Sequence, residues 1–341
     1  MLYFTSDYME GAHPAILEKI NSTNMEKTGG YGTDSYTEEA KAKIREALGI
    51  KTAQVFFLIG GTQTNKVVIS SLLRPYEGVI AAKTGHIAVH EAGAVENGGH
   101  KVIELGHNLG KLCSEDVEKY MECFIRDQNR EHTVKPGMVY ISQPTEYGTL
   151  YSKQELEAVY KVCRKYSLLL FADGARLGYA LASSECDLSL KEFAQCVDVF
   201  YIGGTKCGAL FGEAVVFTSI KAPEGFFSII KQEGALLAKG RLLGIQFSTL
   251  FTGDLYMKIC EKAVKLAAKI KKALKEKGYK IYIDSPTNQQ FVVVEDSFME
   301  KLSKKVSFGY MESCDDTHSV IRFCTSWATD EEDVERLIKM L

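Results

Sequence analysis

The sequence has no apolar run of the roughly 18 residues needed to cross a bilayer, so it predicts no membrane-spanning helix. Its first residues show no basic region followed by a long apolar stretch, so no signal peptide is predicted either. The nine cysteines are scattered, odd in number and never spaced as CxxC. This pattern indicates free thiols in a reducing compartment and predicts a cytoplasmic protein. Proline is scarce, with 6 residues against 29 glycines, which is typical of tight turns rather than rigid linkers.

Neither sign of charge dominates, because 41 Lys and Arg stand against 44 Asp and Glu, a net charge of −3. This balance argues against a nucleic acid or an anionic membrane as a partner. With 45% hydrophobic and 25% charged residues, the composition excludes a mainly disordered, collagen-like or coiled-coil chain. At about 150 residues per domain, the 341 residues predict roughly two domains.

Several familiar cofactor and metal motifs are also absent. The chain has no GxGxxG fingerprint, no HExxH and no Cys/His cluster with zinc spacing, so no metal site is predicted. The segment 106–111 is similar to a phosphate loop, but it is one residue short, and Leu112 replaces the Ser or Thr that would hold magnesium.

What the sequence does contain is a series of short apolar runs separated by segments of helical period. Most runs lack strict alternation, as expected for strands buried on both faces. Helices are expected from Thr37 to near Gly49 and from the capping box Ser152-x-x-Glu155. Strands that alternate with helices predict an α/β fold, a mostly parallel sheet wrapped by helices. The expected strands are Val55–Leu58, Val79–Ala82, Val102–Leu105, Met138–Ser142, Leu168–Ala172, Val197–Ile202 and Ala214–Phe217.

The composition changes near residue 250, where a long amphipathic helix is predicted over 254–277. Its polar side is rich in lysine without interleaved aromatic residues, which indicates a solvated face rather than a nucleic-acid site. Short strand-like segments follow it: Lys280–Ile283, Phe291–Val294 and Ile321–Cys324. A final helix is expected from the box Thr329-x-x-Glu332. We therefore expect an N-terminal arm and large α/β domain in 1–247 and a smaller α+β domain in 248–341.

Two of the expected strands end in residues that suit one cofactor. The strand over 168–172 leads into Asp173, and the strand over 197–202 leads into a glycine-rich loop that holds Lys206. Ligands of open α/β sheets bind at the carboxyl ends of the strands. A lysine and an aspartate on neighbouring strands fit pyridoxal 5′-phosphate, because the lysine forms an imine and the aspartate keeps the pyridine nitrogen protonated.

The remaining parts of such a site follow two other strands. After the strand over 55–58, a Gly-Gly-Thr-Gln sequence opens a helix, and amide groups at a helix N-terminus bind phosphate. The expected phosphate ligands are Gly61, Thr62, the amide of Gln63 and the hydroxyl of Thr205. After the strand over 79–82 comes His86, whose ring would stack on the pyridine.

Each of these features also has an ordinary explanation. An Asp-Gly pair is most often a turn, a Gly-Gly-Thr sequence before a helix is usually a cap, and a single histidine is usually a hydrogen-bonded polar residue. Their occurrence together, each at the end of an expected strand, favours the cofactor site.

The same segments resemble the pyridoxal-phosphate-dependent threonine aldolases, a branch of the fold-type I or aminotransferase-like enzymes. The segments that carry the resemblance are Tyr31–Asp34, Gly61–Thr62, Gly85–Ile87, Asp173–Arg176 and Thr205–Lys206. It extends over nearly the whole chain, from Ser6 to Arg322. It implies retro-aldol cleavage of a β-hydroxy-α-amino acid, with threonine or allo-threonine giving glycine and acetaldehyde.

The resemblance also implies roles for individual residues. It makes Lys206 the Schiff-base lysine, Asp173 the pyridinium partner and His86 the stacking ring. It places Ser6, Arg176 and Arg322 at the substrate carboxylate, although a surface ion pair would also explain Arg322. His132 falls where a second histidine approaches the β-hydroxyl, so the implied base is His132 or a water held by His86.

Two further residues are implied to act across a subunit interface. Arg241 falls where the family has an arginine that reaches the phosphate, and Tyr31 falls where a tyrosine approaches the cofactor of a neighbour. The implied assembly is a homo-oligomer, a dimer at least and a tetramer by resemblance. For Arg241 and His132, a functional and an ordinary structural role remain equally open.

The substrate face departs from the family pattern. Where many members have an Asn-rich turn after the strand ending at Ser142, this chain has Gln143-Pro-Thr-Glu-Tyr-Gly148. The alternatives therefore include other reactions of the same cofactor on amino acids, namely β-elimination, transamination and racemisation. An alternative from another class is a non-catalytic pyridoxal-phosphate-binding protein.

Overall fold

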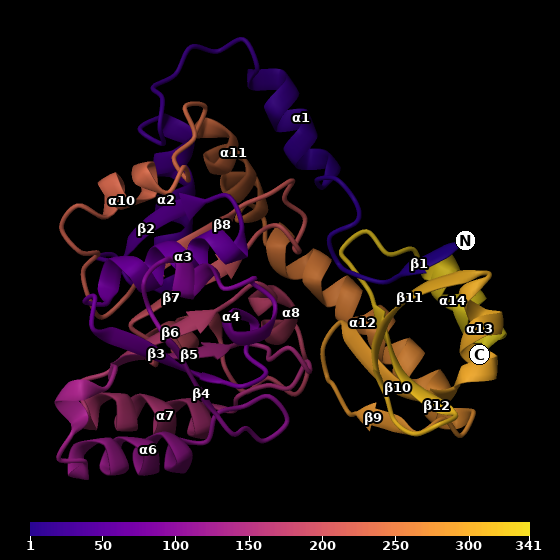
Figure 1. Ribbon diagram of the computed structural model, residues 1–341. Helices are drawn as coiled ribbons and strands as arrows, with labels where there is room; N and C mark the ends of the chain where they lie inside the picture. The colour runs from indigo at the N-terminus through magenta and orange to yellow at the C-terminus, as the bar shows by residue number, and fades with distance from the viewer.

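The computed structural model describes residues 1–341 and arranges them around two β-sheets. The strands of the larger sheet are β2 (Gln54–Leu58), β3 (Glu77–Ala82), β4 (Val102–Leu105), β5 (Lys135–Ser142), β6 (Leu169–Asp173), β7 (Val199–Gly203) and β8 (Glu213–Phe217). The strands of the smaller sheet are β1 (Leu2–Phe4), β9 (Ile281–Ile283), β10 (Gln289–Glu295), β11 (Val306–Ser313) and β12 (His318–Cys324). Figure 1 shows the two sheets in separate lobes, with both chain termini in the smaller one.

The larger sheet has the strand order β2-β8-β7-β6-β5-β3-β4. All the strands expected in this part of the chain are present, within three residues at either end. Only β8 runs antiparallel to its neighbours β2 and β7, and every other pair is parallel. The predicted α/β architecture with a mostly parallel sheet is therefore confirmed.

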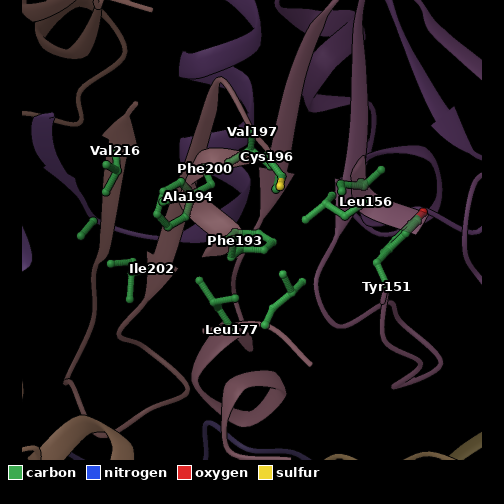
Figure 2. Packing of buried hydrophobic residues seen from close by; sticks show 14 of the residues in the cluster. Tyr151, Leu156, Leu177, Phe193, Ala194, Cys196, Val197, Phe200, Ile202 and Val216 are labelled. Atoms are coloured by element: carbon green, nitrogen blue, oxygen red, sulfur yellow. The ribbon is translucent and has the colours of Figure 1, made fainter. Parts of the chain in front are cut away.

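The larger sheet is buried on both faces, which explains why its strands lack alternation in the sequence. Along β7, Phe200 and Ile202 pack into one apolar cluster, whereas Val199 and Tyr201 pack into another. Figure 2 shows Phe193 beside Phe200 in the first cluster, and their ring centroids lie 5.4 Å apart in an edge-on arrangement. The two clusters together hold the strands that end at the site described below.

Helices cover both lobes and join them. They are α1 (Pro14–Thr23), α2 (Ser35–Leu48), α3 (Gly61–Leu72), α4 (His86–Val89), α5 (Ala94–Asn97), α6 (Ser114–Arg126), η1 (Arg130–His132), α7 (Lys153–Lys165), α8 (Leu177–Leu181), α9 (Leu190–Gln195), α10 (Phe226–Gln232), α11 (Arg241–Leu250), α12 (Leu255–Glu276), α13 (Asp296–Ser303) and α14 (Glu331–Met340). In Figure 1, α6 and α7 lie along the same side of the larger sheet. None of the helices is both long and apolar enough to cross a membrane.

The helix boundaries follow the predicted signals with two exceptions. The helix expected from Thr37 begins at Ser35, because Asp34 is its cap and accepts a hydrogen bond from the Thr37 N–H at 2.9 Å. The Ser152 hydroxyl and the Glu155 carboxylate form the expected capping box at the start of α7. The box predicted at Thr329 is wrong, because Asp330 caps α14 and accepts a hydrogen bond from the Glu332 amide at 3.3 Å. Thr329 instead accepts from the amide of Ser326 at 2.7 Å, so its hydroxyl closes the preceding turn.

The smaller sheet has the order β1-β11-β12-β10-β9. The three expected strand segments are its β9, β10 and β12. Two of its strands were not expected from the sequence: β11, whose second half is exposed, and β1, which has only 3 residues. β1 pairs in parallel with β11, so the N-terminus joins the sheet built by the C-terminal part. The division of the chain at residue 248 falls inside α11 and stays a prediction.

Candidate active site

The carboxyl ends of β5, β6 and β7 meet at a cavity of about 250 Å³. Ser142, the last residue of β5, lies opposite Asp173, the last residue of β6. Strand ends of this kind are the usual ligand site of open α/β sheets. Of the residues predicted from the sequence, those that line the cavity are Gly61, Thr62, His86, Asp173, Arg176, Thr205 and Lys206.

Asp173 is buried and its carboxylate is held from several sides. Oδ2 accepts hydrogen bonds from the Tyr140 hydroxyl at 2.7 Å and the Asn65 amide at 3.1 Å, and Oδ1 accepts from the Ala175 N–H at 2.9 Å. Burial alone would raise the pKa of Asp173, but the charge of His86 and these hydrogen bonds bring it below its ordinary value. Asp173 is therefore an ionised carboxylate, the state that a protonated pyridine nitrogen requires.

Lys206 lies in the loop that leaves β7. A Cβ at Gly203 would lie 2.2 Å from the Ala175 carbonyl oxygen, so this close approach of two chains needs glycine. The Lys206 ammonium forms no ion pair, and its Nζ lies 5.9 Å from the centre of the Tyr8 ring. Burial lowers the pKa of Lys206, and the charge of Arg176 acts in the same direction. Both effects favour the neutral amine, which is the nucleophilic form.

The start of α3 provides free amide donors. The helix begins at Gly61 without a side-chain cap, so the amides of its first turn have no intrahelical partner. A Cβ at Gly61 would lie 3.2 Å from the Tyr201 hydroxyl, which shows how closely this turn approaches β7. The Gln63 side chain is turned away and donates to the Glu233 carbonyl at 3.3 Å. The amides of this turn, rather than the Gln63 side chain, therefore suit a phosphate group.

Thr205 lines the cavity as expected, but its hydroxyl is already engaged. It donates to Oε1 of Glu213 at 2.7 Å and accepts from the Gly212 N–H at 3.0 Å. The expectation of a free hydroxyl for a phosphate group is therefore wrong for this arrangement. The reason is that the carboxylate at the start of β8 lies directly beside it.

Glu213 is a site residue that the sequence analysis missed. Its second oxygen accepts from the Gly204 N–H at 3.1 Å. Burial raises the pKa of Glu213 to about 8, against the opposing effects of the Thr205 hydrogen bond and the Lys206 charge. The available signal was a charged residue placed directly before the apolar run 214–217, since buried charges need a specific partner.

His86 is held by a second carboxylate behind it. Its Nδ1 lies 2.7 Å from Oε1 of Glu91, which is buried. The Asn65 amide nitrogen donates to Glu91 at 2.7 Å and to Asp173 at 3.1 Å, so one side chain links the two carboxylates. Burial lowers the pKa of His86, but the hydrogen bond to Glu91 and the charge of Asp173 bring it above its ordinary value. The ring is therefore oriented and favours the charged state.

Glu146 is another missed residue, in the turn where the sequence departs from the family pattern. It lines the cavity and is half-buried. Its Oε1 accepts hydrogen bonds from the Ser142 hydroxyl at 2.7 Å and from the backbone N–H of His86 at 2.9 Å. A lone glutamate in a turn gives no sequence signal, because only the fold brings it beside His86.

Arg176 lines the cavity, but most of its guanidinium is already paired. Its Nε and Nη2 donate to the two oxygens of buried Asp7 at 2.6 and 3.0 Å. The Asn288 amide donates to the same Asp7 at 2.9 Å. These bonds use two of the five N–H donors of Arg176, so both hydrogens of Nη1 and the second hydrogen of Nη2 are left for a substrate.

Arg322 and Ser6 lie beside the same N-terminal segment. Arg322 donates from Nη1 to Gln289 at 2.9 Å and from Nη2 to the Thr5 carbonyl at 3.0 Å, and its buried Nε has no partner. It forms no ion pair, so the alternative explanation by a surface ion pair does not apply. Ser6 is buried between Thr5 and Asp7. Consecutive residues therefore bring both predicted arginines to one region.

His132 lies outside the cavity of its own chain. It ends η1, is exposed, and comes before the first residue of β5, whereas the cavity lies beyond the last. The 8 residues of β5 span roughly 25 Å of strand. The expectation that His132 approaches a substrate in this chain's cavity is therefore wrong, because counting back from Ser142 leads along the strand away from the site.

Arg241 and Tyr31 also lie outside the cavity of their own chain. Arg241 donates to the carbonyls of Glu26 and Thr23 at 2.7 and 2.6 Å. Tyr31 is exposed and has Lys231 4.5 Å from its ring centre. Neither residue contributes to the site within one chain.

Comparison with known proteins agrees with this geometry. Residues 4–307 match the family model described as beta-eliminating lyase. The low specificity L-threonine aldolase of Pseudomonas aeruginosa is 29% identical to this chain, over 98% of this chain and 96% of its own length. The enzyme of the same name from another Pseudomonas strain is 30% identical, over 98% of this chain and 95% of its own length. The solved structure of a Leishmania major threonine aldolase is 41% identical, with a TM-score of 0.96 and coverage of 99% and 98% of the two chains.

More distant structures share the fold. An aspartate aminotransferase from Thermus thermophilus superposes with a TM-score of 0.72 at 15% identity, over 100% of this chain and 90% of its own. The fold is that of the fold-type I pyridoxal-phosphate enzymes. The chain belongs to the beta-eliminating lyase family.

The residues present fit pyridoxal 5′-phosphate, the cofactor of this family. An ionised carboxylate, an unpaired lysine and a set of unpartnered helix amides line one cavity. These are the groups that a protonated pyridine, an aldehyde and a phosphate each require.

Proposed function

We propose that this protein is a carbon–carbon lyase that cleaves β-hydroxy-α-amino acids, such as threonine and allo-threonine, into glycine and an aldehyde. The observation that carries the proposal is the placement of Lys206 and Asp173 at the ends of adjacent strands, beside the uncapped start of α3. The similarity to the threonine aldolase of Leishmania major, at 41% identity, supports this reaction over others of the same cofactor.

Bound pyridoxal 5′-phosphate supplies an electron sink for the electron pair left on the substrate's α-carbon. The chain's own residues hold it in place. Lys206 binds its aldehyde carbon, Asp173 keeps a proton on the ring nitrogen, and the first amides of α3, from Gly61 to Gln63, bind its phosphate. His86, oriented by Glu91, packs against the ring.

The substrate carboxylate binds near the N-terminal segment, where Ser6 lies between the residues that hold the two arginines. Arg322 and the free N–H groups of Arg176 provide the positive charge and the donors. Both are anchored by other groups, Arg322 by Gln289 and Arg176 by Asp7, so they are already oriented before a substrate arrives. This orientation matters because it decides which bond of the α-carbon is aligned with the electron sink.

The active form is a homo-oligomer in which subunits complete one another's sites. Arg241 and Tyr31 lie outside the cavity of their own chain, which supports the proposal that they serve a neighbour's cofactor. A dimer is the minimum, and a tetramer follows from the resemblance. The free state of every cysteine supports a reducing compartment, the cytoplasm.

The test is to mix the purified, cofactor-loaded protein with the isomers of threonine and phenylserine. We expect equimolar aldehyde and glycine, with no pyruvate and no ammonia. Release of pyruvate and ammonia from serine would instead identify a β-eliminating lyase, and conversion of the cofactor to its amine form would identify an aminotransferase. A protein that binds the cofactor but turns over no amino acid would be a non-catalytic carrier.

The role of Lys206 is tested separately from turnover. Borohydride reduction should attach the cofactor covalently to the peptide that contains Lys206, as read by mass spectrometry. The variant Lys206→Ala should show no such attachment. Attachment at another lysine would contradict the assignment.

A further inference from the structure

We propose that Glu146 is the group that takes the proton from the β-hydroxyl of the substrate. This inference rests on the proposed function, because it assigns a residue to that reaction. Glu146 lies in the turn after β5 and lines the same cavity as Lys206 and Asp173. Its turn begins directly after Ser142, which lies opposite Asp173 in the sheet.

The contacts of Glu146 leave one oxygen free for a substrate. The Ser142 hydroxyl and the backbone N–H of His86 both donate to Oε1, at 2.7 and 2.9 Å. No other residue donates a hydrogen bond to Oε2. The two bonds fix the carboxylate against β5 and α4, so the free oxygen is positioned rather than mobile. A fixed acceptor with one open position is the arrangement that a general base requires.

Neither of the two candidate histidines offers a free acceptor in this chain's cavity. His86 has its Nδ1 bound to Glu91 and favours the protonated state, in which it cannot accept a proton. His132 lies before β5, at the opposite end of that strand, so it does not reach the cavity of its own chain. The charge of His86 acts on Glu146 instead.

The other carboxylates of the cavity are committed elsewhere. Asp173 receives hydrogen bonds on both oxygens and would hold the proton of the ring nitrogen. Glu213 also receives hydrogen bonds on both oxygens, from Thr205 and Gly204. Glu146 is therefore the cavity carboxylate with an oxygen that no protein group occupies.

The surroundings of Glu146 also suit a base. Burial raises its pKa above the ordinary value, and the negative charge of Asp173 on β6 adds to this. The hydrogen bond from Ser142 and the charge of His86 on α4 oppose the rise. A carboxylate with a raised pKa accepts a proton more readily than an exposed one.

The proposed step balances in protons and electrons. Oε2 takes the hydroxyl proton, and the electron pair of that O–H bond forms the carbonyl of the aldehyde. The Cα–Cβ bond breaks, its pair stays on the α-carbon, and the α-carbon takes up one proton to give glycine. One proton leaves the oxygen and one is added to carbon, and the electron pair that Cβ loses stays on the α-carbon, so no external oxidant or reductant is needed.

The experiment compares wild type with Glu146→Gln, which keeps the size and the acceptor oxygen but removes the basic group. We expect kcat for threonine or phenylserine cleavage to fall by about 100-fold or more. Exchange of the α-proton of glycine with D2O does not involve a β-hydroxyl, so we expect it to stay within about threefold of wild type. The dissociation constant of glycine, measured by calorimetry, should also be unchanged.

The same comparison separates the possible outcomes. Cleavage within threefold of wild type in Glu146→Gln would overturn the proposal, and so would an equal loss of cleavage and glycine exchange. A wild-type protein that exchanges the glycine proton but cleaves no β-hydroxy amino acid would refute the proposed function instead. Glu104→Gln, at an exposed position of β4, controls for effects of the purification and of Glu-to-Gln replacement in general.

The pH profile gives a second readout that a purely structural role would not move. Wild-type cleavage should fall on the acid side as Glu146 becomes protonated, and this limb should disappear in Glu146→Gln. Ser142→Ala removes a donor that lowers the pKa of Glu146, so it should move the acid limb to higher pH. An unmoved limb in both variants would contradict the proposal.

Discussion

Carboxyl groups within one small cavity are placed in different protonation states by their immediate partners. Asp173 is surrounded by donors and by the charge of His86, and its pKa lies below the ordinary value. Glu213 and Glu146 have fewer donors, and burial raises the pKa of both. A cofactor enzyme needs this division, since one carboxylate must stay ionised beside the ring while others hold or exchange protons.

Glu213 predicts a measurable pH dependence of stability in the cofactor-free protein. Its pKa rises from 4.5 to about 8 on folding, so between these values the folded state holds a proton that the unfolded state has lost. Its contribution therefore makes the free energy of unfolding decrease as pH rises through this window. In Glu213→Gln we expect a less negative slope, measured by urea unfolding at a series of pH values and constant protein concentration.

The control for this prediction is Glu104→Gln, on an exposed part of β4. Its slope should match that of wild type. An equal slope in wild type and Glu213→Gln would show that the carboxyl is ionised in the folded protein, with Lys206 as its counterion.

At the scale of elements, α12 joins the two lobes. Ile259 and Ala263, in its first half, pack into the core around the larger sheet, whereas Ile270 and Leu274, in its second half, pack into the core of the smaller lobe. Figure 1 shows the helix running between the lobes. A continuous helix of 22 residues transmits the loss of one core to the other, because it cannot keep half of its packing alone.

We therefore expect Ile270→Ala to destabilise both lobes together. Truncation of a buried isoleucine should cost about 2–5 kcal/mol. Trp327 is the single tryptophan and packs beside His13 at 5.6 Å, against the larger core, so its fluorescence reports a region away from the mutation. Its unfolding transition and the far-UV circular dichroism transition should shift to lower denaturant by the same amount.

The matched control is Lys272→Ala, on the exposed side of the same helix, which should leave both transitions in place. If the Trp327 signal kept its wild-type midpoint in Ile270→Ala, the lobes would unfold separately and α12 would not couple them.

At the scale of the whole molecule, the residues predicted for the site do not all lie at one cavity of the chain. Lys206, Asp173 and the start of α3 meet within the chain, whereas Arg241 and Tyr31 lie on other surfaces. A symmetric dimer would bring such residues to the neighbour's cavity twice, because each contact of a two-fold interface occurs in both directions.

Subunit mixing tests this arrangement. Lys206→Ala and Arg241→Ala should each be nearly inactive alone. In a mixed dimer, the Lys206→Ala subunit supplies Arg241 to the intact Lys206 of its partner, so one site is complete. Equal amounts, dissociated and reassociated together, should recover about a quarter of the wild-type activity. If the mixture stayed inactive although mass spectrometry showed mixed dimers, Arg241 would act within its own chain.

Much of the fold and part of the site could be predicted because their signals are local. Each strand of the larger sheet appears in the sequence as an apolar run, and Asp173 and Lys206 each follow such a run directly. β11 is harder to predict, because its alternating apolar residues Val306, Phe308 and Tyr310 form only a short run and the strand is exposed from Tyr310 onward. The cap of α14 was placed one residue early, because adjacent Thr329 and Asp330 are equally suitable residue types and only the chain path distinguishes them.

The sequence by itself determined the alternating strands and helices and the cofactor class, because these depend on local periodicity and on single residues at strand ends. Only the tertiary structure decided that Arg176 is paired with Asp7 and that the Thr205 hydroxyl donates to Glu213. It also decided that His132 lies at the end of β5 away from the cavity. Those contacts join segments that are distant in the chain or depend on strand direction. Their geometry arises only when the sheet is assembled.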